Sequence, residues 1–130
     1  MKKYACLFLR RLFKNEVMSI VAVIRFRYSC GSAWKKSKVV SGIYNSVEPH
    51  ITNSDNHTTI SCDKWYSITS KLQKLVKNWD SEYVNPAILD GLQWSFELVF
   101  DNDEHLYFKG SNKFPNNWKK FTKYVEHIGE

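Results

Sequence analysis

The sequence predicts an α+β fold, in which an antiparallel sheet of four to five strands has two helices packed on one face. Two observations support this fold class. A two-residue periodicity with β-branched and aromatic side chains runs through residues 18–29 and 92–100, as in half-buried strands. Apolar residues recur at helical spacing after residue 61 and again after residue 115. Strand pairs separated by helices favour a two-layer domain, for which 130 residues are sufficient.

The first two strands are expected to pair as a hairpin. Residues 38–44 are the second strand, and the connecting loop contains Trp34. In the first strand, Arg25 and Arg27 share one face because successive side chains alternate between faces. The other face of this strand is apolar and carries Met18, Ile20, Ala22, Ile24, Phe26 and Tyr28.

Pro49 restricts the next segment, because proline cannot donate a hydrogen bond to a neighbouring strand. Residues 47–52 are therefore predicted to be an edge strand or an extended segment. Ser61 or Cys62 then begins a helix that ends near residues 78–80. Its apolar stripe consists of Trp65, Ile68, Leu72, Leu75, Val76 and Trp79.

The second hairpin is predicted after a linker that spans residues 81–89. Residues 92–100 alternate again, residues 101–104 form a polar turn, and residues 105–109 return as the partner strand. Pro115 suits the first turn of the last helix, where a missing N–H has no intrahelical partner. The core face of the first of these strands carries Leu92, Trp94, Phe96, Leu98 and Phe100.

Charge divides the chain into a basic N-terminal part and a slightly acidic remainder. Residues 1–40 contain ten Lys or Arg residues and one Glu, a net charge of +9, whereas residues 41–130 carry −3. Residues 1–17 are interpreted as a basic N-terminal appendage, with a short helix that docks on the domain or lies on a membrane as the alternative. Residues 18–130 are predicted to form a single α+β domain. The uneven charge is compatible with nucleic-acid, membrane or acidic-protein contacts, although a solubilising surface is the simpler explanation.

The cysteines are odd in number and widely spaced, at Cys6, Cys30 and Cys62. They match neither a disulfide framework nor a zinc motif, so reduced thiols are expected. No apolar run approaches the roughly 18 residues of a membrane span. The apolar stretch at residues 4–9 is shorter than the core of a signal peptide. We therefore expect a cytoplasmic protein.

Two short motifs flank the second hairpin. The first is D-G-L-Q-W at residues 90–94, and the second is G-S-N-K-F-P at residues 110–115. Together they resemble a pattern near the C-terminus of many small uncharacterised bacterial proteins, namely D-G-x-Q-W, a β-hairpin, G-S-N-x-[YF]-P and a short final helix. The resemblance covers residues 90–128. It implies the hairpin and helix of this segment and assigns no activity to it.

The polar residues of these motifs have two interpretations. Asp90, Gln93 and Asn112 are candidates for a ligand or peptide site at one end of the hairpin. The structural interpretation is that Asp90 and Asn112 bond to loop backbone, while Gly91 and Gly110 supply unusual φ values. The structural interpretation is favoured, because these residue types are common in turns.

The first hairpin is the better candidate for function. Trp34 precedes two lysines, and such a tryptophan is suited to anchor a partner protein or to stack on a base. The arginines of the first strand are expected to join these lysines in a basic surface on the outer face of the sheet. The candidate residues for binding a partner protein or nucleic acid are Arg25, Arg27, Trp34, Lys35, Lys36 and Lys38.

Motifs for catalysis and metal binding are absent from the sequence. The four histidines lack metal-ligand spacing, residues 101–104 are too short for a calcium loop, and Cys30 and Cys62 have no evident partner base. No cofactor and no metal are expected. The sequence therefore favours a non-enzymatic protein-interaction module, an inhibitor or accessory factor of a bacterium or a mobile element. The alternative is a nucleic-acid-binding protein that uses the basic first hairpin, although an RNP-type aromatic pair, a helix-turn-helix and a zinc knuckle are missing.

Overall fold

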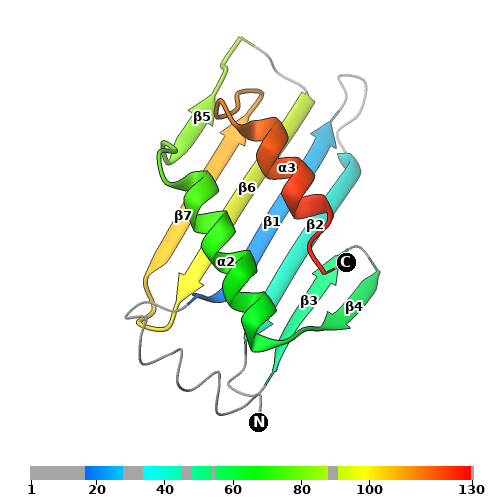
Figure 1. Cartoon of the computed structure of the whole chain (residues 1–130). Coiled ribbons are helices and arrows are strands. Elements are labelled where there is room, and N and C mark those ends of the chain that lie inside the picture. Colours follow the sequence, from blue (N-terminus) through cyan, green and yellow to red (C-terminus); the bar gives the residue numbers. More distant parts are fainter. Residues whose placement is uncertain (1–16, 28–33, 45–47, 54, 88–90, 130) are drawn as a thin grey trace.

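The computed structural model describes residues 17–27, 34–44, 48–53, 55–87 and 91–129, without the side chains of residues 25–27 and 34–37. The described ranges contain seven strands and two helices (Figure 1). Their order is β1 (Val17–Arg27), β2 (Trp34–Tyr44), β3 (Pro49–Asn53), β4 (Asn56–Thr59), α2 (Cys62–Val76), β5 (Glu82–Val84), β6 (Gly91–Phe100), β7 (His105–Ser111) and α3 (Trp118–Glu126).

All seven strands form one sheet in the order β4-β3-β2-β1-β6-β7-β5. Every neighbouring pair is antiparallel except β5 and β7, which run parallel. Both helices lie diagonally across the same face of the sheet (Figure 1). The predicted α+β class is therefore confirmed. The predicted number of four to five antiparallel strands is wrong, because the sheet is mixed and has seven strands.

The first hairpin forms as the alternation predicts, with Val23 opposite Val39 in the register of β1 and β2. Trp34 is the first residue of β2 and pairs with Arg27, so it does not lie in the loop where it was expected. β1 begins at Val17, one residue before the predicted start of the domain, and the Val17 side chain is buried.

The two additional strands, β4 and β5, are short edges that the sequence pattern does not reveal. β4 consists of N-H-T-T and has no buried side chain, and β5 has only three residues. β3 is an inner strand between β2 and β4, not the expected edge strand. It accommodates Pro49 because proline is tolerated as the first residue of a strand.

Helix α2 starts where its sequence predicts. The Ser61 hydroxyl accepts a 3.1 Å hydrogen bond from Lys64 N, which satisfies one of the free N–H groups of the first turn. The apolar stripe faces the sheet, and the helix ends at Val76, before Trp79. Helix α3 begins at Trp118, so Pro115 lies in the turn before the helix, where its carbonyl accepts from Trp118 N.

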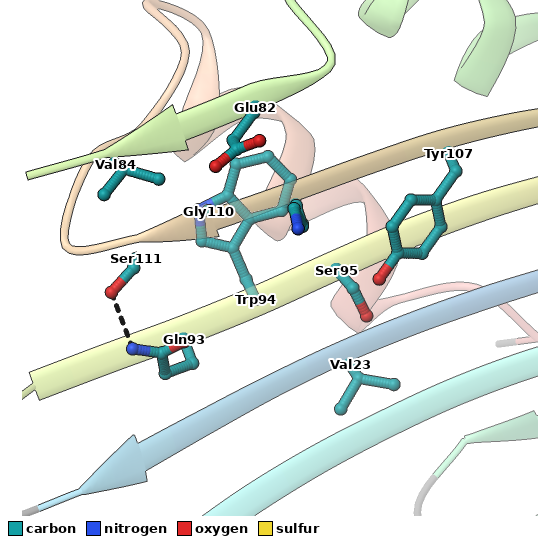
Figure 2. Close-up of a pocket in the computed structure, with 10 residues that line it drawn as sticks. Val23, Glu82, Val84, Gln93, Trp94, Ser95, Tyr107, Gly110 and Ser111 are labelled. Carbon is teal, nitrogen blue, oxygen red and sulfur yellow. Dashed lines mark hydrogen bonds between the residues drawn. The ribbon is translucent and has the colours of Figure 1, made fainter.

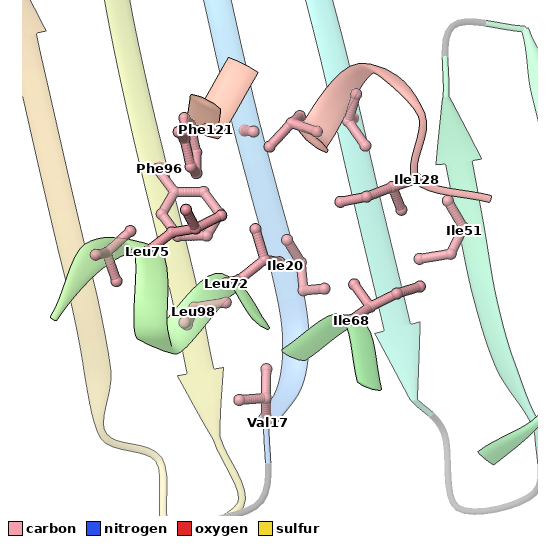
Figure 3. Packing of buried hydrophobic residues seen from close by; sticks show 14 of the residues in the cluster. Val17, Ile20, Ile51, Ile68, Leu72, Leu75, Phe96, Leu98, Phe121 and Ile128 are labelled. Carbon is pink, nitrogen blue, oxygen red and sulfur yellow. The ribbon is translucent and has the colours of Figure 1, made fainter. Parts of the chain in front are cut away.

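A continuous apolar core fills the space between the helices and the sheet (Figure 3). Trp65, Leu72, Phe96 and Leu98 have no exposed surface at all. The Trp65 Nε1 group donates a 2.9 Å hydrogen bond to Val17 O. The indole N–H is therefore paired although the ring is fully buried. The predicted core faces of both long strands are thereby confirmed, since Ile20 and Ala22 are buried and Trp94, Phe96 and Leu98 line the same layer.

Cys62 forms a disulfide, so the expectation of a reduced thiol is wrong for this residue. Cys6 and Cys30 lie outside the described residues. The cysteine pattern therefore no longer supports the expected cytoplasmic location, which stays a prediction. Neither helix in the described ranges has the length and apolar character that crossing a membrane requires.

Candidate functional site

The candidate site lies on the outer face of the sheet, opposite the helices. Strand geometry places alternate residues on this face, and several of its apolar side chains face solvent. The exposed fraction is 54% for Ile43, 50% for Tyr107, 43% for Val84 and 42% for Val39. In the part of the chain that the structure describes, no helix covers this face (Figure 1).

A concavity of about 360 Å³ occupies this face over β1, β6, β7 and β5. Figure 2 shows the strands that cross it and the side chains that border it. Its volume is at the lower end of the range of pockets that hold small ligands, and it is open to solvent. It is lined by Val23, Glu82, Val84, Gln93, Trp94, Ser95, Tyr107, Lys109, Gly110 and Ser111.

Polar groups at one end of the concavity are fixed by the chain itself. Gln93 Nε2 donates a 2.6 Å hydrogen bond to Ser111 Oγ, and this bond joins β6 to β7 across the face (Figure 2). Ser95 lies opposite Lys109 in the same strand pair, and Glu82 of β5 is next to Lys109 on the other side. The site therefore combines an exposed tyrosine and two valines with a fixed amide, a lysine and a carboxylate.

Gly110 of β7 allows the Trp94 ring to pack directly against the backbone of β7 beneath this site. Gly110 lies opposite Trp94, and a Cβ atom at residue 110 would overlap the indole ring. The Trp94 Nε1 group donates a 3.0 Å hydrogen bond to Lys113 O. Gly110 is thus required for a close approach, and the expectation of an unusual φ at this residue is wrong, because the positive φ values of glycines occur at Gly91 and Gly129.

The two C-terminal motifs pair with one another directly. Asn112 Oδ1 accepts a 2.9 Å hydrogen bond from Leu92 N, and Asn112 N donates a 2.9 Å bond to Leu92 O. Gly91 has φ of 122° and Asn112 has φ of 56°, so both adopt conformations that suit glycine or asparagine. The structural interpretation of Asn112 as a residue that bonds to backbone is confirmed. Asp90 lies outside the described residues.

A histidine–carboxylate pair is also present on this face. His105 Nδ1 lies 3.1 Å from Glu97 Oε2, and the two side chains are 54% and 33% exposed. A histidine of this kind acts as a general base only when a nucleophile lies within hydrogen-bond reach. Among the described residues, the polar contact of His105 is with Glu97, so the pair is best explained as a cross-strand interaction that stabilises β6 and β7.

Of the predicted site residues, Lys38 is the one whose side chain the structure describes. The side chains of Arg25, Arg27, Trp34, Lys35 and Lys36 lie outside the described residues, although the backbone register places Arg25 opposite Gln93 of the candidate site.

Lys38 lies on the face covered by the helices, not on the predicted outer surface. It pairs with Ile24 in the sheet, and Lys38 Nζ lies 3.8 Å from Glu126 Oε1 of α3. A second hollow, of about 420 Å³, lies beside this ion pair. There the Asn53 amide donates to Glu126 O and Ile128 O, so its polar groups already serve the end of α3.

Sequence reasoning missed the concavity because its residues come from four strands, two of them separated by more than 60 residues. Gln93 and Ser111 could have been recognised as site residues, since both belong to the paired C-terminal motifs. Glu82 and Val84 could not have been recognised, because the sequence around them predicts a linker. Within the described ranges, no three His, Cys, Asp or Glu side chains lie close enough together to hold a metal ion.

Comparison of the chain with models of protein families, with curated proteins and with solved structures finds no match. The resemblance to small uncharacterised bacterial proteins therefore stays a prediction.

Proposed function

We propose that the chain is a small non-enzymatic protein-interaction module whose outer sheet face binds a partner protein. The observation that carries this proposal is the contrast between the two faces. The helices use one face to build the core, whereas the other presents Val39, Ile43, Val84 and Tyr107 to solvent. Several exposed apolar side chains on one uncovered sheet face are a feature of protein contact surfaces.

The concavity supplies the shape that such a surface needs. Binding energy in protein interfaces is concentrated where an apolar anchor of one partner fills a recess of the other. A recess between Val23, Val84 and Tyr107 is suited to receive one aliphatic or aromatic side chain. Lys109 and Glu82 at its border would then pair with polar groups of the partner, which favours orientation more than affinity.

A partner-capture experiment with surface variants tests this function. Full-length protein is immobilised, and captured proteins are compared among the wild type, Ile43→Lys and Tyr107→Ala. Leu106→Lys is the matched control, because Leu106 is 39% exposed and belongs to the same strand as Tyr107 but to the other face. We expect both outer-face variants to lose a stoichiometric partner that the control retains. Equal capture by all four proteins, or no stoichiometric partner at all, contradicts the proposal.

The alternative function, nucleic-acid binding by the first hairpin, is supported by fewer residues. Lys38 is on the opposite face and paired with Glu126, so it is not part of an outer basic surface. Variants Arg25→Gln and Arg27→Gln separate the two functions. Loss of oligonucleotide binding in these variants favours the alternative, whereas loss of the protein partner in Ile43→Lys favours the proposal.

A further inference from the structure

The two helices and the loops beside them form a basic layer on the side of the molecule opposite the candidate site. The described side chains include ten lysines and ten acidic residues, so the described part is balanced overall. This balance is not local, because residues 61–80 and 113–129, which comprise the two helices and the loops beside them, contain eight of the ten lysines and only Asp63, Asp80 and Glu126 of the acidic residues. The eight lysines, here called the lysine layer, are Lys64, Lys71, Lys74, Lys77, Lys113, Lys119, Lys120 and Lys123.

The lysine layer is continuous across the junction of the helices. Lys71 and Lys74 in the C-terminal half of α2 and Lys77 at its C-cap follow at three-residue intervals, about 4.5 Å apart along the helix axis. Helix α3 begins beside this end, because the Asn117 amide donates a 2.7 Å hydrogen bond to Leu75 O. Lys119 and Lys120, both exposed, follow directly in the first turn of α3.

The charge of this layer is largely uncompensated within the described chain. Glu126 is paired with Lys38, which is not a member of the layer. None of the members from Lys71 to Lys123 forms an ion pair with a described residue. Like charges held close together repel one another, and a bound polyanion reduces this repulsion. The polyanion also releases its condensed counterions when it binds, which favours association.

An exposed aromatic ring lies within the lysine layer. Phe114 is 37% exposed, follows Lys113 and packs its ring 5.2 Å from that of Trp118 at an angle of 34°. Trp118 is held in turn by Trp94, with ring centroids 4.7 Å apart. A ring that is supported from behind and open in front, among cations, is a platform on which an unpaired base can stack.

We propose that the lysine layer binds single-stranded nucleic acid, with lysines on the phosphates and Phe114 beneath a base. Charge alone fits any polyanion, including duplex nucleic acid and an acidic protein. The exposed face of Phe114 selects the single strand, because bases in a duplex are already stacked on one another. This surface lies on the helix side of the sheet and is independent of the proposed protein-binding face.

Fluorescence anisotropy with labelled oligo-dT and oligo-U of about 15 nucleotides tests the proposal, at about 50 and 200 mM salt. The two oligonucleotides distinguish DNA from RNA as the ligand. We expect the full-length chain to bind, with affinity falling steeply as salt increases. The variant Lys71→Gln/Lys74→Gln/Lys77→Gln reduces the slope of log affinity against log salt by about 2, since each lost phosphate contact contributes about 0.7 on a single strand.

Two residue pairs provide matched controls. Phe114→Ala is expected to weaken binding by about 5- to 150-fold without changing the salt slope, the effect of losing one stacked base. Tyr107→Ala removes an exposed ring from the other face, and Lys109→Gln removes a lysine there, so both retain wild-type affinity. Circular dichroism confirms that each variant is folded.

Several results overturn the proposal. Binding that is undetectable at low salt excludes it. Binding that survives the triple lysine variant but is lost in Arg25→Gln/Arg27→Gln assigns the nucleic acid to the first hairpin instead. Equal affinity for a duplex with no effect of Phe114→Ala excludes the stacking platform. Competition by polyglutamate at equal charge concentration identifies an acidic protein as the better ligand.

Discussion

The indole N–H of Trp79 donates a 2.7 Å hydrogen bond to Asn117 Oδ1, which places the end of α2 against the start of α3. The same amide donates through Nδ2 to Leu75 O, also at 2.7 Å. Trp79 and Asn117 are 38 residues apart in sequence. A single side chain therefore satisfies a terminal carbonyl of one helix and an indole donor, and it fixes how the two helices meet.

We predict that Asn117→Ala lowers the free energy of unfolding by about 1–3 kcal/mol, because it leaves a partly buried donor and a partly buried carbonyl without partners. Denaturant unfolding followed by tryptophan fluorescence measures the change. Asn116→Ala is the control, since Asn116 is exposed and a surface substitution of this kind changes stability by less than about 0.5 kcal/mol. Equal effects of the two substitutions would show that the bridge contributes nothing.

Gly110→Ala is predicted to destabilise the sheet by about 1–3 kcal/mol, because the added methyl group overlaps the Trp94 ring and overpacks the layer. Trp94→Leu opens space at the same position, although it has its own cost as a large-to-small core substitution. We therefore expect the cost of Gly110→Ala to fall below about 1 kcal/mol in the Trp94→Leu background. Denaturation of the four proteins of this double-mutant cycle measures the coupling. Strict additivity would mean that the indole is not what excludes a side chain at residue 110.

Substitutions at Asn112 separate a hydrogen bond from a backbone conformation. Asn112→Gly retains the left-handed conformation and removes the acceptor for Leu92 N, at a cost of about 1 kcal/mol. Asn112→Ala removes the same acceptor and adds about 1–2 kcal/mol of strain, because alanine is disfavoured at φ of 56°. Thermal unfolding of the two variants should therefore give a lower midpoint for alanine. A lower midpoint for glycine would show that left-handed strain is not significant here.

The long elements could be predicted from the sequence because each has its own periodicity. The stripe from Trp65 to Val76 and the alternation from Trp94 to Leu98 point into the same core. Local chemistry also placed the start of α2 at Ser61 or Cys62, and the helix begins at Cys62 with Ser61 as its N-cap. These features depend on residues that are close together in the sequence, so they can be predicted from the sequence alone.

The short edge strands and the candidate site could not be predicted in this way. β5 has the sequence E-Y-V, and it becomes a strand only because β7 offers it a parallel edge, with Glu82 next to Lys109. The concavity exists because β5, β7, β6 and β1 are neighbours, which follows from sheet order and not from any motif. The lysine layer could not be predicted for the same reason, since its members are spread through residues 41–130, whose net charge is −3.

Tyr124 of α3 is predicted to make stability depend on pH in the alkaline range. Partial burial removes water from the phenol and raises the pKa of Tyr124 above its ordinary value of 10.0. The folded state therefore holds this proton more tightly than the unfolded state does. The resulting stabilisation is fully present below the unfolded pKa and is lost as pH rises through the folded pKa.

The comparison of wild type with Tyr124→Phe isolates this effect, because all other tyrosines and the lysines titrate in both proteins. We expect the stability of the wild type relative to Tyr124→Phe to be constant between about pH 7 and pH 9 and to fall above about pH 10. Urea unfolding at each pH measures the two free energies. Phenylalanine cannot ionise and so retains its burial at high pH, which makes the variant the more resistant protein there. A difference between the two proteins that stays constant up to about pH 11.5 would show that the phenol ionises equally well in both states.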